Sequence, residues 1–451
     1  MRPNWAEISR AALAGNVRTF RRRLRAAGGA EPMLCAVVKA NAYGHGLIAC
    51  AQVCQAAGAA WLAVTDTAEA VALRRAGIGG RILVLGDFDG DEAGAMVRHG
   101  LTPTVWMRAQ VERLARAAKW RGAGRAAALP IHLNVDTGMS RLGSPAGEFA
   151  ALARYAARRG LAVEAAYTHL ASSEGPAAGV AAQMRRFFAA LSTLEPGVAA
   201  PGFYWHAANS AAAWRWPGGR RELPGAAGVG STARRGALGH GAAPPAALGR
   251  KPKSAGAKRG RAAFAPQNAG LAPEGAGMVM APQGAGLVPQ AAGMLRVGLG
   301  LYGICLAPGA DAELRPVLAW KTRIVALRDV PAGTPVGYGG DRPGGWKAPR
   351  RARIATLACG YADGYPRAIS FARGAHVLVR GRRAPLAGRV SMDLMGVDVS
   401  AVPTARVGDE VVLIGAQGPA RITASDVAGW AGTIAYEVTC AIAARVQRHY
   451  H

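Results

Sequence analysis

The sequence predicts an α/β protein, with an N-terminal TIM-like (β/α)8 barrel, a mostly β C-terminal domain and a long disordered insert late in the barrel. Three observations predict this. In the first half, short apolar runs alternate with Ala-rich helical stretches, a pattern typical of a parallel sheet with crossover helices. After about residue 311, strand-like runs are separated by Gly, Pro and Asp turns. Between residues 218 and 292, neither pattern occurs.

The barrel strands are expected at the apolar runs Met33–Val38, Ala60–Val64, Ile82–Leu85, Thr102–Val105, Ile131–Val135, Val163–Thr168 and Gly202–Trp205. Helices are expected at Leu47–Ala57, Gln110–Lys119 and Glu148–Arg158. Seven or eight strand–helix repeats without a strong break favour a closed barrel over an open sheet. Catalytic residues of such barrels lie at the carboxyl ends of the strands. The polar residues at those ends are Lys39, Asp136, His169, His206 and Arg296.

The second domain is expected to contain the strands Val317–Val330, Ile354–Ala358, His376–Val379, Val397–Val399 and Glu410–Ile414. We therefore assign residues 1–310 to the barrel and residues 311–451 to the C-terminal β domain.

The insert at 218–292 is rich in Gly, Ala, Pro and Arg and holds ten basic and two acidic residues. This composition cannot bury enough apolar surface to offset the entropy of ordering, so we expect disorder. The closure cost of a flexible loop grows only logarithmically with its length. The barrel should therefore tolerate the insert.

The chain is strongly basic, with 55 Lys and Arg against 27 Asp and Glu and a net charge of +28. Compositional drift toward Arg, Ala and Gly is our preferred explanation, and a nucleic-acid or acidic-surface partner is the alternative. A groove for single-stranded nucleic acid would have aromatic residues among the basic ones. Aromatic residues are 6% here and are not interleaved in this way. We therefore do not expect a nucleic-acid partner.

The six cysteines form no C-x-x-C pair and no cluster with zinc spacing, so we expect no metal site and a reducing environment. There is no run of about 18 apolar residues, so we expect no membrane span. The Arg-rich N-terminus lacks the apolar core of a signal peptide. The expected location is the cytoplasm.

The sharpest local signal is the string VVKANAYGHG at residues 37–46. A lysine at the end of a buried strand loses its proton more easily, because desolvation disfavours the charged amine. Such a lysine suits Schiff-base chemistry. Taken alone, Lys39 is more commonly a solvated strand end.

This string closely resembles the pyridoxal-phosphate lysine motif of alanine racemases. Further blocks resemble the same family in the expected order: RPNWAEI at 2–8, NVDTGMSRLG at 134–143, THLA at 168–171, HAANSAA at 206–212, RVGLGLYG at 296–303, GYG at 337–339, GYADGYPR at 360–367, GRVSMD at 388–393 and TIAYEV at 433–438. The resemblance covers essentially the whole chain except 218–292.

The resemblance implies a pyridoxal 5'-phosphate enzyme that interconverts L-alanine and D-alanine, supplying D-alanine for peptidoglycan. Lys39 would anchor the cofactor and act as the base on one face of the substrate. Tyr338, contributed by the partner subunit, would act on the opposite face, which implies a homodimer with shared active sites. Arg296 would face the pyridine nitrogen, and its permanent charge would keep that nitrogen unprotonated and suppress transamination.

The remaining site residues also follow from the resemblance. The cofactor would contact Lys39, Tyr43, His169, Ser210, Arg296, Gly298, Leu299 and Tyr436. The substrate carboxylate would meet Arg141 and the backbone N–H of Met392. Asn134, Tyr361 and Asp393 would support the site.

Three positions depart from the family pattern. Asn134 stands where many members have a carbamylated lysine whose negative charge orients the substrate-binding arginine. We hypothesise that a bound anion such as chloride takes that role beside Arg141. Ser391 replaces a common Cys, and Gly337 replaces a common Ser.

Other functions remain open at this point. A broader amino-acid or serine racemase is the nearest alternative, and a same-fold aldolase or decarboxylase is disfavoured by Arg296. Gly298, Gly300 and Gly303 match the dinucleotide fingerprint in spacing, but no acid follows about 20 residues later. A second role of the basic insert, at Lys251–Arg261, in binding nucleic acid or an acidic surface is the third alternative.

Overall fold

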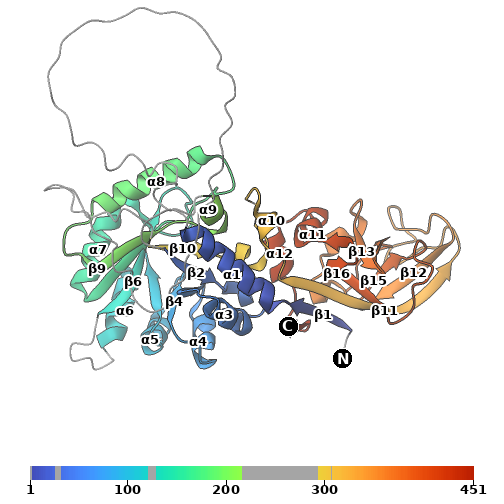
Figure 1. Cartoon of the computed structure of the whole chain (residues 1–451), viewed down its shortest axis with the longest axis horizontal. Helices are drawn as coiled ribbons and strands as arrows, with labels where there is room; N and C mark the ends of the chain where they lie inside the picture. Colours follow the sequence, from blue (N-terminus) through green and yellow to red (C-terminus); the bar gives the residue numbers. More distant parts are fainter. Residues whose placement is uncertain (1–2, 26–31, 120–127, 216–292, 306) are drawn as a thin grey trace, which may run out of the picture.

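The structure, a computed structural model, describes residues 3–25, 32–119, 128–215, 293–305 and 307–451. Two adjacent bodies make up these residues, a barrel surrounded by helices and a β-rich body that extends from its side (Figure 1). The predicted insert at 218–292 lies outside the described residues.

The first body is a barrel of eight parallel strands in the order β10-β2-β3-β4-β5-β6-β8-β9. These are β2 (Met33–Val37), β3 (Trp61–Val64), β4 (Arg81–Val84), β5 (Thr102–Val105), β6 (Leu129–Asp136), β8 (Leu161–Tyr167), β9 (Ala199–His206) and β10 (Met294–Val297), with the short β7 (Ser144–Pro145) beside β6. Two backbone hydrogen bonds close the seam between β9 and β10: Gly293 N–H donates to Trp205 O and Arg296 N–H to Ala208 O, both at 3.0 Å. The predicted barrel is confirmed.

Helices cover the outside of the barrel (Figure 1). They are α1 (Arg10–Arg25), α3 (Leu47–Ala56), α4 (Thr67–Arg75), α5 (Gly90–Arg98), α6 (Arg108–Lys119), α7 (Phe149–Arg158), α8 (Ala177–Ser192) and α9 (Ser210–Arg215), with the turn η1 (Ala146–Glu148) before α7. Polar side chains set where some of them begin. Asp66 caps α4 by accepting from Glu69 N–H, and Asp89 and Glu92 form a reciprocal capping box on α5.

The second body is a nine-stranded sheet built on the path β14-β13-β16-β11-β1-β18. Its strands are β1 (Asn4–Ile8), β11 (Leu318–Val330), β12 (Ala352–Leu357), β13 (His376–Val379), β14 (Arg382–Pro385), β15 (Met395–Asp398), β16 (Glu410–Gln417), β17 (Ala420–Ile422) and β18 (Gln447–Tyr450). The short helices α10 (Ala310–Glu313), η4 (Tyr361–Asp363), η5 (Arg367–Phe371), α11 (Ala424–Ala431) and α12 (Ala435–Cys440) connect them. The mostly β character predicted from the sequence is confirmed.

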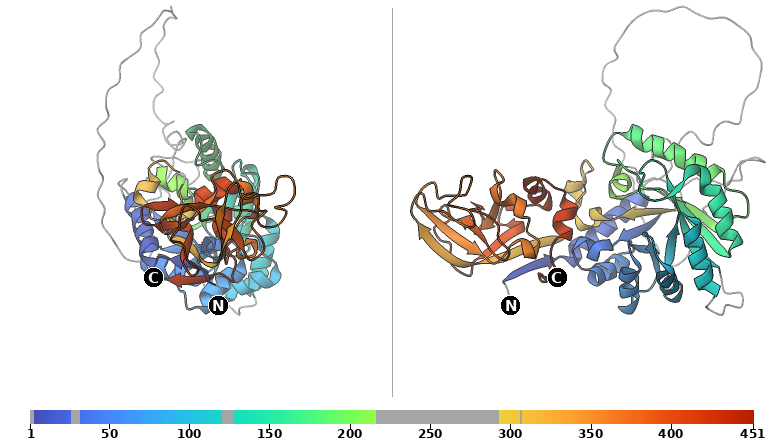
Figure 2. Two further views of the ribbon diagram at one scale, coloured as in Figure 1. Left: turned by 90° about the vertical axis from the view of Figure 1, so that its right-hand side faces the viewer. Right: turned by 180° about the vertical axis from the view of Figure 1, so that it is seen from behind.

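The N-terminal strand belongs to this second sheet. β1 pairs antiparallel with β11 and parallel with β18, so both termini lie at the junction of the two bodies (Figure 2). The buried indole of Trp320 donates to Asn4 Oδ1 at 2.7 Å. One hydrophobic cluster runs through both bodies. The boundary between residues 310 and 311 stays a prediction, and the chain crosses between the bodies before it as well.

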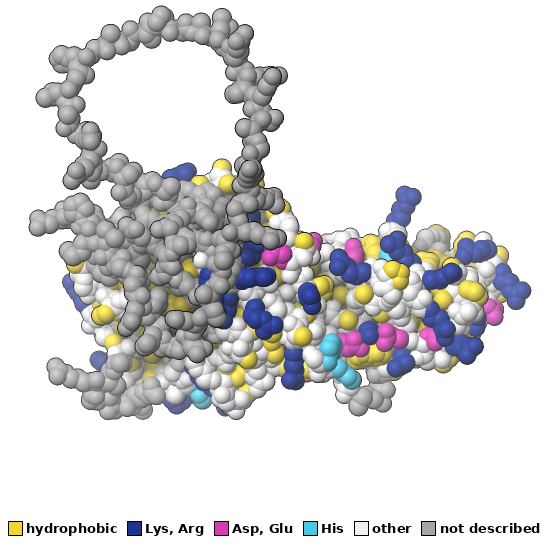
Figure 3. Space-filling model, viewed as in Figure 1, with side chains coloured by type: hydrophobic (Ala, Val, Ile, Leu, Met, Phe, Trp, Pro, Cys, Tyr) yellow, Lys and Arg dark blue, Asp and Glu magenta, His cyan; other side chains and the backbone are white. Residues whose placement is uncertain are grey.

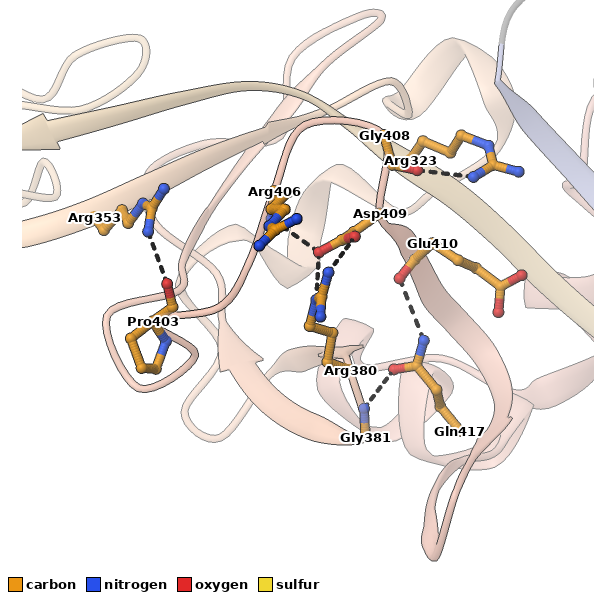
Figure 4. Close-up of polar contacts among 10 residues, drawn as sticks. All are labelled: Arg323, Arg353, Arg380, Gly381, Pro403, Arg406, Gly408, Asp409, Glu410 and Gln417. Carbon is orange, nitrogen blue, oxygen red and sulfur yellow. Dashed lines mark hydrogen bonds and ion pairs between the residues drawn. The ribbon is translucent and has the colours of Figure 1, made fainter.

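Arginines of the second body bind main-chain carbonyls and acids (Figure 4). Arg380, at the β13–β14 turn, has φ +48° and holds both carboxylate oxygens of Asp409, at 2.6 and 2.9 Å. Arg323 donates to Gly408 O at 2.7 Å, and Arg353 to Pro403 O at 2.9 Å. Part of the positive charge therefore holds loops in place. On the face in Figure 3, basic side chains of this body are spread among Asp and Glu.

Candidate active site at the carboxyl end of the barrel

The backbone turn that begins at Lys39 is left-handed. Lys39 follows β2 directly and starts the one-turn segment α2 (Lys39–Tyr43). The four residues 40–43 have φ between 53° and 55°, the left-handed region. Left-handed conformation costs roughly 1–2 kcal/mol per residue for L-amino acids, so neighbouring groups must hold the turn.

Groups from the barrel hold the first part of this turn. Glu69 Oε1 accepts from Asn41 N–H at 2.9 Å, and Asn41 Oδ1 accepts from Leu47 N–H at 2.8 Å. His45 is fully buried, with Nδ1 at 3.0 Å from Ala42 O and 2.9 Å from Tyr43 O. Burial lowers the pKa of His45 to about 4, so the ring is neutral and Nδ1–H is the donor.

The C-terminal end of the chain holds the second part. Arg448 donates through Nε and Nη2 to Gly44 O, both at 3.1 Å, and Tyr450 donates to His45 O at 3.2 Å. Gly44 has φ +84°, and a Cβ there would overlap the carbonyl oxygen of Thr439. The turn after Lys39 therefore depends on residues about 400 positions later.

Lys39 itself lies in a largely desolvated, positively charged setting. Burial lowers the pKa of the Lys39 amine, and the charge of Arg141 lowers it further, against opposing effects of Cys440 and Glu69. The amine is thus more easily deprotonated than an ordinary lysine, as the strand-end position indicated.

Arg296 is the most buried cation of the site, with 4% of its surface exposed. Its Nη1 donates to Nδ1 of His206, and its Nη2 donates to Thr168 O at 2.9 Å. The guanidinium also lies over the Tyr167 ring, 4.4 Å from the centroid. No ion pair in the described part of the chain includes Arg296, so its charge remains available to a ligand.

The pKa of His169 is lowered by burial and by positive charges nearby. Burial lowers its pKa to about 3, and the nearby charges of Arg296, Arg141 and Lys39 contribute. Three cations therefore converge around one neutral histidine, and the site suits an anionic ligand. Arg141 follows the loop in which Asp136 Oδ1 accepts from the N–H groups of residues 138–140 at 2.9–3.1 Å. Asn134 is buried, and its Oδ1 has no partner among the described residues.

A second group gathers hydrogen-bond donors where β10 ends. Ser210 Oγ, at the start of α9, accepts from Gly298 N–H at 3.0 Å and from Gly300 N–H at 3.2 Å. A Cβ at Gly298 would overlap the hydroxyl of Tyr43, so a larger residue there would displace the Tyr43 ring. The ring centroids of Tyr43 and Tyr436 are 6.1 Å apart. Leu299 begins the 3-10 segment η3 (Leu299–Tyr302), which is not the α-helix that a dinucleotide fingerprint would open.

The site residues predicted in the second body are exposed. Tyr338 is 76% exposed, Met392 55% and Tyr361 41%. Tyr361 N–H donates to Ser391 O at 3.0 Å, and this hydrogen bond places Tyr361 beside the loop that contains Met392. Asp393 accepts from Arg445 at 2.8 Å. No hydrogen bond or ion pair of the described residues joins the side chain of Tyr338 to the barrel site.

The sequence pointed to His206 as a strand-end residue but assigned it no role, and it did not single out His132. Both rings are fully buried in the barrel, and the structure places His206 against Arg296. The block HAANSAA, which begins at His206, was the available signal.

The described residues include no cluster of three or more His, Cys, Asp or Glu that could hold a metal ion. Within the same part of the chain, every helix is too short or too polar to cross a membrane.

Comparison with known proteins agrees with the geometry. The profile of the alanine racemase N-terminal domain matches residues 8–231, and that of the C-terminal domain matches residues 317–450. The chain belongs to the alanine racemase family. Its relatives include the alanine racemases of Symbiobacterium thermophilum (37% identical, over 100% of this chain and 97% of the relative) and Bordetella petrii (36%, over 99% and 98%).

Solved structures of the family have the same fold. The alanine racemase of Bacillus anthracis with bound L-Ala-P aligns with a TM-score of 0.74 at 27% identity, over 100% of this chain and 95% of that one. The enzyme of Streptomyces lavendulae aligns with a TM-score of 0.75 at 27% identity, over 100% and 97%.

Proposed function

We propose that this protein is an alanine racemase that interconverts L-alanine and D-alanine with pyridoxal 5'-phosphate as its cofactor and provides D-alanine for peptidoglycan. The observation that carries the proposal is the convergence of the desolvated Lys39 amine and the buried Arg296 guanidinium at the carboxyl end of one barrel. Family membership supports the same activity.

The donor set fits this cofactor. The Ser210 hydroxyl, the N–H group of Leu299, and the hydroxyls of Tyr43 and Tyr436 are neutral donors suited to a phosphate, as at phosphate sites in late barrel loops. The Gly298 N–H, which donates to Ser210 Oγ at 3.0 Å, would join them by turning from Ser210 to the phosphate. Gly298 leaves room for close approach because it has no side chain. Lys39 would hold the aldehyde carbon. When bound, the cofactor supplies a sink for the electrons left behind when the substrate loses its α-proton.

In one direction of the reaction, Lys39 Nζ would remove the α-proton from one face of the substrate, and the hydroxyl of the partner subunit's Tyr338 would deliver a proton to the opposite face. In the other direction the two groups would exchange these roles. A base must be unprotonated to accept a proton, and the lowered pKa of Lys39 increases that fraction near neutral pH. The cations around His169 favour a tyrosinate brought to that place, because opposite charge stabilises the ionised phenol.

The exposure of Tyr338, Met392 and Tyr361 supports a homodimer with shared active sites. Tyr338 stands between Gly337 and Gly339, both in left-handed conformation at φ 71° and 70°, in the segment that joins β11 to β12. A projecting tyrosine with no partner on its own barrel can reach the Lys39 site of a second copy. Met392 N–H and Asp393 would lie at the same edge.

Arg296 would orient the cofactor ring. Arginine has donors and no acceptor, and it stays charged in proteins. Facing a pyridine nitrogen, it would donate a hydrogen bond and leave that nitrogen without a proton of its own. The cofactor would then supply a weaker electron sink, which would favour racemisation over transamination. Arg141 would bind the substrate carboxylate.

The test compares wild type with Lys39→Ala, using Lys119→Ala on the exposed side of α6 as the control. We expect wild type and Lys119→Ala to show the visible absorption of bound cofactor and to racemise alanine. Lys39→Ala should lose both. A wild-type protein that takes up cofactor but leaves L-alanine unchanged would refute the proposal, and a panel of other L-amino acids would then identify a different racemase specificity.

A further inference from the structure

A line of polar side chains runs through the barrel interior, away from the candidate site. It begins at Arg296, whose Nη1 donates to Nδ1 of His206. Nε2 of His206 lies 3.0 Å from Nδ1 of His132. Nε2 of His132 lies 3.2 Å from the Tyr204 hydroxyl and 3.6 Å from Glu164 Oε2. Glu164 is in turn bound by Arg81.

These residues come from the neighbouring strands β6, β8, β9 and β10, except for Arg81, which comes from β4 across the barrel interior. Arg81 opens β4, His132 is on β6, Glu164 is on β8, His206 ends β9 and Arg296 is on β10. Both histidine rings are fully buried. Most buried side-chain polar atoms have a hydrogen-bond partner, and both nitrogens of both rings have polar neighbours here. The line therefore needs a consistent arrangement of protons.

The Arg296 end of the line permits only one arrangement for neutral rings. Arg296 has donors and no acceptor, so Nδ1 of His206 must be the bare, accepting nitrogen. Its Nε2 then carries the hydrogen and donates to Nδ1 of His132. His132 must in turn carry its hydrogen on Nε2, 3.2 Å from the Tyr204 hydroxyl, which can accept it, and 3.6 Å from the Glu164 carboxylate, whose negative charge attracts it. The far end is therefore compatible with the same direction.

The charge states agree with this arrangement. Burial holds the pKa of His206 well below its usual value, with the charge of Arg296 adding to the effect. Burial also lowers the pKa of His132. Burial alone would raise the pKa of Glu164, but the His132 contact and the charge of Arg81 together lower it. Two neutral rings thus lie between a cation and a carboxylate.

We propose that His206 and His132 form a one-directional hydrogen-bond chain, favoured at its far end by the charge of the nearby Glu164 carboxylate, and that this chain holds the Arg296 guanidinium in place. His206 acts on Arg296 directly, and His132 and Glu164 are positioning residues that fix its tautomer. The inference rests on the proposed function only in assigning Arg296 to the cofactor. The tautomers of His206 and His132 do not depend on which ligand Arg296 faces.

The hydrogen-bond chain explains how the buried Arg296 guanidinium can face a ligand in one orientation. The Thr168 carbonyl and His206 Nδ1 are two acceptors that the guanidinium meets at defined positions. If His206 changed to the Nδ1–H tautomer, a donor would face a donor, and Arg296 would have to turn away. The Glu164 carboxylate, 3.6 Å from Nε2 of His132, disfavours this change because its charge favours a hydrogen on that nitrogen.

The experiment measures the tautomers directly, in the full-length protein with histidine labelled in 15N, with and without cofactor. The signals of His132 and His206 are assigned by substituting each in turn. We expect both rings to be neutral at pH 7.5, with bare Nδ1 and protonated Nε2. A proton on Nδ1 of either ring in wild type would overturn the proposal without any variant.

The variant Glu164→Gln tests the positioning role. An amide NH2 can donate to Nε2 of His132 and so permits the opposite direction. We expect a second tautomer in both rings and a fall in the kcat of racemisation of about 10- to 100-fold, as for lost outer partners of other site ligands. Glu195→Gln, which removes an exposed partner of Arg154, is the control and should change neither.

Each result separates the two proposals. A fall in kcat without a change of tautomer would overturn the chain, as would unchanged kcat and tautomers in a folded Glu164→Gln. The expected tautomers in a wild-type protein that does not racemise alanine would refute the proposed function and support the chain.

Discussion

The barrel and the β-rich body present the candidate site in opposite ways. On the barrel, Arg296 is buried and Lys39 half-buried, and neighbours of the same chain hold Arg296 and the turn after Lys39. On the β-rich body, Tyr338 and Met392 are largely exposed to solvent. One chain therefore completes the part that we propose holds the cofactor, while the residues proposed for the opposite face would need a second copy of the chain.

The largest expected effect tests whether Lys39 and Tyr338 of one active site come from different chains. Lys39→Ala and Tyr338→Phe should each lose at least about 100-fold in activity as homodimers, the usual scale for removing a proton-transfer group. Mixed one to one and allowed to exchange subunits, they should recover about one quarter of wild-type activity, because half of the dimers then hold one intact site in an isologous pair.

No recovery after confirmed exchange would place both bases in one chain. Mixing Lys39→Ala with the double variant Lys39→Ala/Tyr338→Phe is the matched control, since no arrangement of those chains restores a site.

The dependence of the Lys39 turn on the C-terminal residues can be sharpened with two glycines. Gly44→Ala adds a Cβ that overlaps Thr439 O, whereas Gly77→Ala at φ +78° adds one that meets nothing within 4 Å. Both share the left-handed strain of roughly 1–2 kcal/mol. We expect Gly44→Ala to lower the free energy of unfolding further and to reduce cofactor binding. Equal losses in urea unfolding would show that the turn does not depend on this contact.

The same turn predicts a pH dependence of stability. The folded pKa of His45 is about 4, below the unfolded value of 6.5. As pH falls from 6.5 to 4, the unfolded chain binds a proton that the folded chain excludes, so stability decreases by up to about 3 kcal/mol. Urea unfolding from pH 7.5 to 4.5 measures this. His45→Asn should show a shallower loss over that range, and a slope equal to wild type would exclude His45 as the cause.

The smallest expected effect concerns Asn134 and Arg141. If chloride supplies the missing negative charge, its replacement by gluconate at constant ionic strength should raise the KM for alanine about two- to fivefold, the scale of an exposed ion pair of ~0.5–1 kcal/mol. The kcat should hardly change. Asn134→Asp, with a fixed charge, should make KM insensitive to chloride. A wild-type KM that ignores the anion would remove the hypothesis.

Local pattern predicted the fold well because strands and helices follow hydrophobic periodicity. The predicted strand Thr102–Val105 agrees with β5 at both ends, and the predicted helix Leu47–Ala57 is one residue longer than α3. The position of β1 was not predicted, because its partners β11 and β18 lie more than 300 residues away. Only a folded chain shows such pairings.

The same distinction between local and long-range features applies to the candidate site. The strand-end position of Lys39 predicted a more easily deprotonated amine, which follows from local burial. The contact between Arg296 and His206 spans 90 positions and depends on how the barrel closes, so spacing could not reveal it. The roles of Tyr338 and Met392 remain predictions, because they concern a surface between two chains.

The hydrogen bonds from Arg448 and Tyr450 to the turn after Lys39 have a consequence for the order in which the protein folds. Lys39 is synthesised about 400 residues before Arg448 and Tyr450, and domains generally fold from the N-terminal end during synthesis. The barrel strands can pair while the chain is still attached to the ribosome, but the carbonyls of Gly44 and His45 accept from these donors only after residues 448 and 450 have emerged. A nascent chain that has not reached these residues would therefore have a barrel whose lysine turn lacks these hydrogen bonds.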